Sequence, residues 1–156
     1  MVVSLIDGSI LTAKIWNGIQ WFSGIDTIKM AGPFANAWTD VSGGRVPAVI
    51  LNGTGTIFAD FNFEAAYAAT QALFRLLYTS GTTGSPGTVF KTIDPCYGSN
   101  KSEGDYLDIK GFVSNIPSGT YSVWLQVNQT AGSPNAVNIG TQNSGTAMIL
   151  TTLDAV

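Results

Sequence analysis

Four acidic residues in a glycine-containing segment are the best candidates for a metal site. They are Asp94, Glu103, Asp105 and Asp108. Calcium takes about six to eight oxygen ligands, which the carboxylates and backbone carbonyls of such a loop can supply. The segment lacks the spacing of an EF-hand, and acidic side chains on a solvated hairpin loop also keep a strand edge from pairing. We therefore expect a solvated loop and no cofactor, with calcium binding as the alternative.

The residues that usually catalyse hydrolysis are missing or unpaired. The chain contains no histidine, which excludes a Ser-His-Asp triad and removes the commonest general base. A glycosidase needs two carboxylates on either side of the sugar bond. No spacing marks such a pair, although Glu64, Glu103 and the aspartates could meet in space. We therefore predict that the protein is not an enzyme.

The aromatic residues offer a binding chemistry instead. Aromatic rings stack on the apolar faces of sugars, while amide and carboxylate groups bind the hydroxyls. Trp124 is the best placed, because alternation along a strand puts it on one polar face with Ser122 and Gln126. Trp124 and Gln126 are thus candidate glycan contacts. The alternative is that the tryptophans fill the core and the subunit contacts, where Trp and Tyr are enriched.

The composition excludes several classes of protein. Only 11% of the residues are charged, 45% are hydrophobic, and the net charge is −3. The seven Lys and Arg are scattered, so no basic patch can bind nucleic acid. No run of about 18 apolar residues predicts a membrane span. The hydrophobic content argues against disorder. We expect a folded domain with a polar surface that carries few charges.

The N-terminal residues predict a three-stranded β-meander. Asp7-Gly8 and Asn17-Gly18 suit two-residue hairpin turns, which need positive φ at both central positions. The strands would cover residues 2–6, 9–16 and 19–23.

This meander carries apolar residues on both of its faces. In the predicted register, one face includes Trp16, Ile19 and Trp21. A single domain has one main core, so the second apolar face must be covered by the predicted helix, by another subunit or by a larger assembly to which the protein binds. These three residues are our candidate interface residues, and we predict a homotrimer, since closed rings are the usual solution.

The rest of the chain predicts strands and one helix. The run 46–51, the turn at 52–55 and the alternating run 56–63 predict a hairpin. Apolar residues at spacings of three and four predict a helix near 64–78. Further strands are expected near 88–93, 105–113, 120–128, 136–141 and 146–153. The predicted fold class is a mainly β protein: an antiparallel β-sandwich or jelly roll with the N-terminal meander and one helix, in a single domain of residues 1–156.

The last third of the chain resembles a known group of proteins. A turn of the Pro-Ser-Gly-Thr-Tyr type at 117–121 leads into an alternating strand, and a final strand covers Thr146 to Leu153. In this style the chain is similar to the trimeric jelly rolls of virus and phage accessory proteins. These are capsid decoration proteins, head fibres and tail-fibre tips, and C1q/TNF-type domains are similar in a less specific way.

The resemblance implies a non-enzymatic structural protein of a viral or phage particle. Such a protein would decorate or cement a capsid or form a fibre, binding capsid or tail proteins and associating with its own copies within the virion. The alternative is a carbohydrate-binding module, including a receptor-binding fibre tip that binds a glycan on the host surface. No functional residue comes from the resemblance, because these proteins share no site motif.

Overall fold

The computed structural model describes residues 14–22, 30–31, 37–67, 71–82, 86–93, 101–131, 137–139 and 146–154. These residues form ten strands: β1 (Lys14–Phe22), β2 (Met30–Ala31), β3 (Thr39–Leu51), β4 (Gly55–Tyr67), β5 (Gln71–Ser80), β6 (Thr88–Ile93), β7 (Lys101–Ile116), β8 (Gly119–Ala131), β9 (Val137–Ile139) and β10 (Thr146–Asp154). The strands expected near 88–93, 105–113, 120–128, 136–141 and 146–153 are confirmed as β6 to β10. The described part of the chain contains no helix with the length and apolar character that crossing a bilayer requires.

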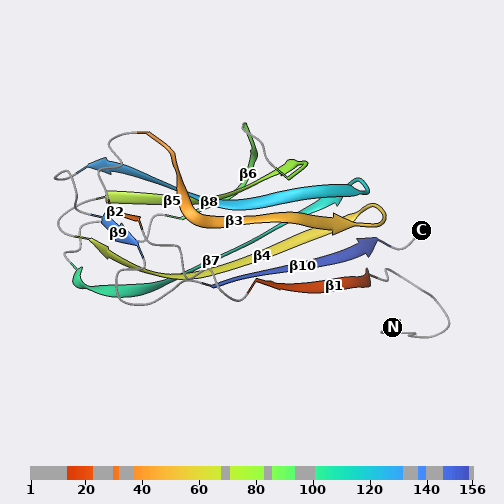
Figure 1. Ribbon diagram of the computed structural model, residues 1–156, viewed down its shortest axis with the longest axis horizontal. Helices are drawn as coiled ribbons and strands as arrows, with labels where there is room; N and C mark the ends of the chain where they lie inside the picture. Colours follow the sequence, from red (N-terminus) through yellow and green to blue (C-terminus); the bar gives the residue numbers. More distant parts are fainter. Residues whose placement is uncertain are drawn as a thin grey trace.

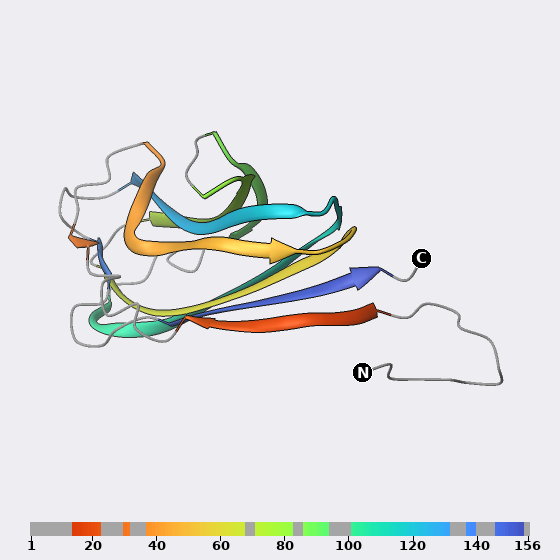
Figure 2. The same ribbon diagram turned by 45° about the vertical axis from the view of Figure 1, so that its right-hand side comes forward.

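The strands form two layers. One sheet has the order β1-β10-β4-β9-β2, with β7 paired to β4, and the other has the order β3-β8-β5-β6. Figure 1 shows the β3-β8-β5-β6 sheet, which we call the upper sheet, above the other sheet, which we call the lower sheet. In Figure 2 strand β6 rises from the upper sheet. The antiparallel pairs β5–β6, β4–β7, β3–β8 and β1–β10 are nested in sequence. Such nesting is one long antiparallel ribbon rolled into two sheets, which is a jelly roll.

The hydrophobic core lies between the two sheets. Its largest fully buried side chains are Leu51, Ile57, Phe61, Phe63, Phe74, Leu76, Ile109, Leu125 and Ile149. The Phe63 ring of β4 and the Phe74 ring of β5 meet across the layers, with centroids 5.1 Å apart. The alternation expected in 56–63 and 120–128 is confirmed, because every second residue of these runs is buried in this core.

The helix predicted near 64–78 is wrong. Strand β4 continues to Tyr67 and β5 begins at Gln71, so the described part of this segment is extended. Ala72, Phe74 and Leu76 alternate into the core, and Leu77 is also buried, beyond a register shift against β6. Apolar residues on both sides of one strand therefore produced the helical spacing. Pairing with β8 and β6 outweighs the weak helix propensity of the segment.

The hairpin turn predicted at Asn17-Gly18 is also wrong. Strand β1 runs through this dipeptide and pairs with β10, with a register shift between Trp16 and Gly18. Asn17 is the extra residue of a β-bulge in this pairing. Strand β1 thus pairs with β10, at the far end of the chain, and not with a neighbouring strand as the predicted meander requires. The strand predicted at 2–6 and the turn at Asp7-Gly8 lie outside the described residues.

Strands β3 and β4 do not form the predicted hairpin. The turn after Leu51 is present, but β3 pairs with β8, whereas β4 pairs with β10 and β7. The turn therefore carries the chain from one sheet to the other. Leu51 and Ile57 are both buried in the core from their two layers, so the strands pack face to face instead of edge to edge.

Gly55 lies where this turn enters the lower sheet, and it gives a test of the architecture. A Cβ atom at Gly55 would collide with the backbone carbonyl of Thr152 in β10, whereas one at Gly53 would make ordinary contacts with Leu153. We expect Gly55→Ala to lower the free energy of unfolding by at least about 2 kcal/mol. Gly53→Ala should change it by less than about 0.5 kcal/mol. Urea unfolding of both variants measures this, and equal effects would contradict the pairing of β4 with β10.

Candidate functional site

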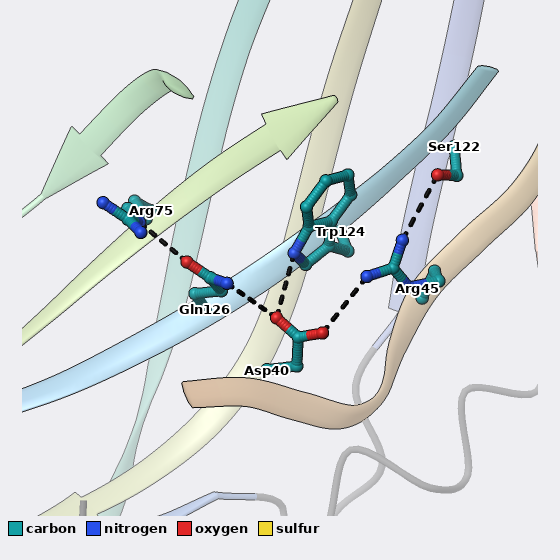
Figure 3. Close-up of polar contacts among 6 residues, drawn as sticks. All are labelled: Asp40, Arg45, Arg75, Ser122, Trp124 and Gln126. Atoms are coloured by element: carbon teal, nitrogen blue, oxygen red, sulfur yellow. Dashed lines mark hydrogen bonds and ion pairs between the residues drawn. The ribbon is translucent and has the colours of Figure 1, made fainter. Parts of the chain in front are cut away.

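The outer face of the β3-β8-β5-β6 sheet carries a connected polar network around Asp40. One oxygen of the Asp40 carboxylate, Oδ1, accepts hydrogen bonds from Trp124 Nε1 at 3.1 Å and Gln126 Nε2 at 2.7 Å. The other oxygen, Oδ2, pairs with a terminal nitrogen of Arg45 at 3.1 Å. The second terminal nitrogen of Arg45 donates to Ser122 Oγ at 3.2 Å. Figure 3 shows the carboxylate between Trp124, Gln126 and Arg45.

A second arginine joins the network from β5. Arg75 Nε donates to Gln126 Oε1 at 2.8 Å. The two guanidinium groups also lie over aromatic rings, Arg45 over Trp124 and Arg75 over Trp38, each at 4.0 Å from the ring centroid. The Asp40 side chain is 53% exposed, so its ion pair contributes little stability and mainly fixes positions.

Strand geometry explains why these residues meet. Ser122, Trp124 and Gln126 occupy alternate positions of β8, opposite to the core residues of that strand. Asp40 stands opposite Gln126 and Arg45 opposite Trp124, with a register shift between them in β3. The spacing of Asp40 and Arg45 is odd, so an unbroken strand would put them on opposite faces. The irregularity brings both to the outer face.

The two residues predicted as glycan contacts, Trp124 and Gln126, both belong to this network. The Trp124 side chain is only 1% exposed, because Arg45 covers one face and Gly87 lies against the six-membered ring. Both polar groups of the Gln126 amide are in use, since it donates to Asp40 and accepts from Arg75. The parity argument placed Trp124 on the correct face but could not show what covers it. A glycan contact at these two residues stays a prediction.

Sequence reasoning missed the three charged members of this site, Asp40, Arg45 and Arg75. Each is a single charge among uncharged neighbours in sequence. Only the pairing of β3 and β5 with β8 brings them together.

The outer face of the other sheet carries a different surface, which we call the apolar face. It consists of Thr56, Phe58, Phe112, Leu150 and Thr152, which line an open groove of about 320 Å³. Phe112 is 68% exposed, although it is one of the large apolar residues. The register aligns Leu150 of β10, Phe58 of β4 and Phe112 of β7 in one row across three strands.

The predicted interface residues lie on β1, beside this row. Ile19 stands opposite Leu150, Trp21 opposite Met148, and Trp16 opposite Thr152. Positions directly opposite one another in an antiparallel pair belong to the same sheet face. The bulge at Asn17 keeps the position of Trp16 in step with those of Ile19 and Trp21. The register thus brings the three positions to the same face as Leu150.

A charged cluster borders the apolar face. Lys110 Nζ lies 2.8 Å from Asp108 Oδ2 and 3.3 Å from Asp60 Oδ2. Burial raises the pKa of Asp60, and a hydrogen bond to Asp108 raises it further. Burial also tends to raise the pKa of Asp108, but hydrogen bonds to Lys110 and Asp60 outweigh it and lower this pKa. The two carboxyl groups therefore differ in acidity although they share one lysine.

The acidic residues considered for calcium do not form a described loop. Asp94 lies outside the described residues, whereas Glu103, Asp105 and Asp108 lie on strand β7. Asp108 pairs with Lys110. The described residues contain no group of three or more His, Cys, Asp or Glu that could hold a metal ion.

Comparisons with known proteins give likenesses of structure. No protein-family model matches the sequence, and no curated protein matches it significantly. A chain in the structure of infectious bursal disease virus, Gx strain, is similar with a TM-score of 0.51 and 6% identity. The match covers 90% of this chain but only 33% of the viral chain, so this protein spans about a third of that length.

Two further structures are similar at lower scores. The globular domain of zebrafish complement 1qA has a TM-score of 0.36 and 16% identity over 74% of this chain and 71% of that chain. The C-terminal CBM6 module of LamC from Zobellia galactanivorans has a TM-score of 0.40 and 15% identity over 89% and 98%. The viral match, at 6% identity, supports the fold alone, in agreement with the nested strand pairing. The chain is a jelly-roll β-sandwich.

The carboxyl pair at the edge of the apolar face makes stability depend on pH. Because the folded pKa of Asp60 is raised, its contribution is fully present below the unfolded pKa and is lost as pH rises through the folded value. We expect the free energy of unfolding to fall over this window, starting near about pH 4. Asp60→Asn should remove this fall.

Lys110→Gln is the matched variant for this experiment. Lys110 lowers the pKa of Asp60, so its loss should raise that pKa further and enlarge the fall in stability. Urea unfolding at a series of pH values measures both variants. Parallel curves for the wild type and Asp60→Asn would contradict the assigned coupling.

Proposed function

We propose that this chain is a non-enzymatic structural protein of a viral particle, a capsid decoration, cement or fibre protein that forms a homotrimer. Its action would be binding: one face associates with other copies, and the assembly attaches to capsid or tail proteins of the virion. The observation that carries the proposal is the row of apolar residues on the outer face of the lower sheet.

This row is unusual for an outer sheet face. Outward positions of a two-layer sandwich normally alternate as polar residues with the core positions. Here Phe58, Phe112 and Leu150 occupy such positions in three neighbouring strands, and β1 adds the position of Ile19 at the edge. Leaving this row in contact with water costs a free energy of about 25 cal/mol for each Å² of apolar surface that a partner could bury.

A second copy of the chain is the occupant that best fits this face. The neighbouring cluster contains two carboxylates and one lysine, so it presents both charge signs to an identical face. With 11% charged residues, the surface offers little charge repulsion to prevent association. A stable interface needs about 800 Å² from each partner, so the contact between copies must extend beyond the groove itself.

The jelly-roll fold supports the same proposal. The viral chain that matches above a TM-score of 0.5 comes from the structure of a virus particle. A binding role requires no catalytic group, which is consistent with a sequence that contains no histidine. The alternative of a glycan contact at Trp124 requires that ring to be open, whereas Trp124 is buried and covered by Arg45.

Phe112 allows a direct test of self-association. Its side chain is 68% exposed, so Phe112→Ser should leave the fold intact while removing the most prominent part of the apolar face. We expect the wild type to have the mass of a trimer at micromolar concentration and the Phe112→Ser variant to have the mass of a monomer. Light scattering and native mass spectrometry measure both.

Val89→Ser is the control, because Val89 is 41% exposed on β6 of the other sheet. This variant should remain a trimer. A monomeric wild type, or a Phe112→Ser variant that keeps the wild-type mass, would contradict the proposal.

A further inference from the structure

The guanidinium of Arg75 lies at the centre of the outer face of the β3-β8-β5-β6 sheet and is only partly used. Strand β5 lies between β8 and β6, and Arg75 stands opposite Gln126 on one side and Thr92 on the other. Its Nε atom is bonded to Gln126, and its flat face lies on Trp38. Among the residues that the structure describes, none accepts a hydrogen bond from its two terminal nitrogen atoms.

Arg45 shows what a satisfied arginine looks like in the same network. It also stacks on a tryptophan, but one of its terminal nitrogens pairs with Asp40 and the other donates to Ser122. Asp40 is the one carboxylate of the network, and both of its oxygens already have partners there. The network therefore holds two guanidinium groups and one carboxylate, a local excess of positive charge in a chain of net charge −3.

Partial burial of the Arg75 guanidinium makes this excess of positive charge unfavourable. Desolvation lowers the pKa of Arg75, and the charge of Asp40 offsets the effect in part. An external anion that binds the free edge of the guanidinium would complete the charge balance. The planar fork of arginine fits a carboxylate by two parallel hydrogen bonds, which are stronger than bonds between neutral groups.

The surroundings of the fork indicate what else the ligand must carry. Trp38 is partly exposed beside Arg75, and the exposed Thr92 is its neighbour on β6. An indole and a hydroxyl next to a carboxylate site suit a hydroxylated ring that bears a carboxylate. We propose that Arg75, with Trp38 and Thr92, binds the carboxylate of an acidic saccharide, such as a sialic acid or uronic acid unit.

This site lies on the sheet opposite to the apolar face, so it is independent of the proposed trimer. It also differs from the glycan contact predicted at Trp124 and Gln126, because Gln126 holds Arg75 in place here and Trp124 donates to Asp40. Gln126 holds the Nε edge of Arg75, and Asp40 holds Gln126 in turn. The terminal edge of Arg75 is thereby presented to the ligand.

Saturation-transfer NMR with free N-acetylneuraminic acid and with glucuronic acid tests the site on the full chain. Neutral N-acetylglucosamine, sodium acetate and inorganic phosphate serve as comparison probes. We expect at least one acidic sugar to bind more tightly than all three comparison probes. Preference for phosphate, equal binding of the neutral sugar, or no binding of either acidic sugar would overturn the proposal.

Variants then locate the site. Arg75→Gln should weaken the acidic sugar at least about tenfold, because a charge-assisted pair of hydrogen bonds is lost. Arg75→Lys keeps the charge but not the fork, so it should bind several-fold more weakly than the wild type while remaining folded. Lys91→Gln removes an exposed cation of β6 and should bind as the wild type does. Unchanged binding in both Arg75 variants would overturn the assignment, as would an equal loss in Lys91→Gln.

Discussion

The nested pairing of the strands is the constraint on which the rest of this structure depends. Four antiparallel pairs, from β5–β6 at the centre of the chain to β1–β10 near its ends, are rolled into two layers. Each outer pair joins residues far apart in sequence, so the order of folding must bring in distant segments at considerable cost in loop entropy. The core residues of both layers offset this cost, since every second residue is buried from Ile57 to Ala65 in β4 and from Tyr121 to Val127 in β8.

The same pairing creates two outer faces with different chemistry. On the upper sheet, β8 collects Asp40 and Arg45 from β3 and Arg75 from β5 into one network. On the lower sheet, β4 aligns Phe112 from β7 with Leu150 from β10. Few charges are present in the chain, and several of those described gather in two small clusters, Asp40 with its arginines and Lys110 with its aspartates. The apolar face is therefore left without a charged cover.

The sequence was informative wherever one strand face is apolar and the other polar. Alternation in 56–63 and 120–128 predicted the buried residues of β4 and β8, and the turn signals predicted the positions of β6 to β10. It misled where both faces of a strand are covered. In β5, Leu77 is buried on the side opposite to Phe74, and the combined pattern imitated a helix. At Asn17-Gly18 the local signal suits a bulge as well as a turn, and only the partner strand decides between them.

The candidate sites also differ in how far the sequence could predict them. The register brings Trp16, Ile19 and Trp21 to positions beside the apolar face, although the predicted meander was not the reason. The Asp40 network required knowledge of two strand pairings, β3 with β8 and β5 with β8, which no local pattern contains. For Trp124, strand alternation predicted the correct sheet face but could not predict burial. The residues that cover its ring, Arg45 and Gly87, come from other segments of the chain.

We propose that this jelly roll is a structural component of a virus particle and that it joins its own copies through the apolar face. Electron cryo-microscopy of particles purified from the source of this sequence is the decisive experiment. We expect threefold clusters of the chain on the particle, with Phe58, Phe112 and Leu150 in the contacts between copies. Particles that lack the chain, or density in which this face is open to solvent, would refute the proposal.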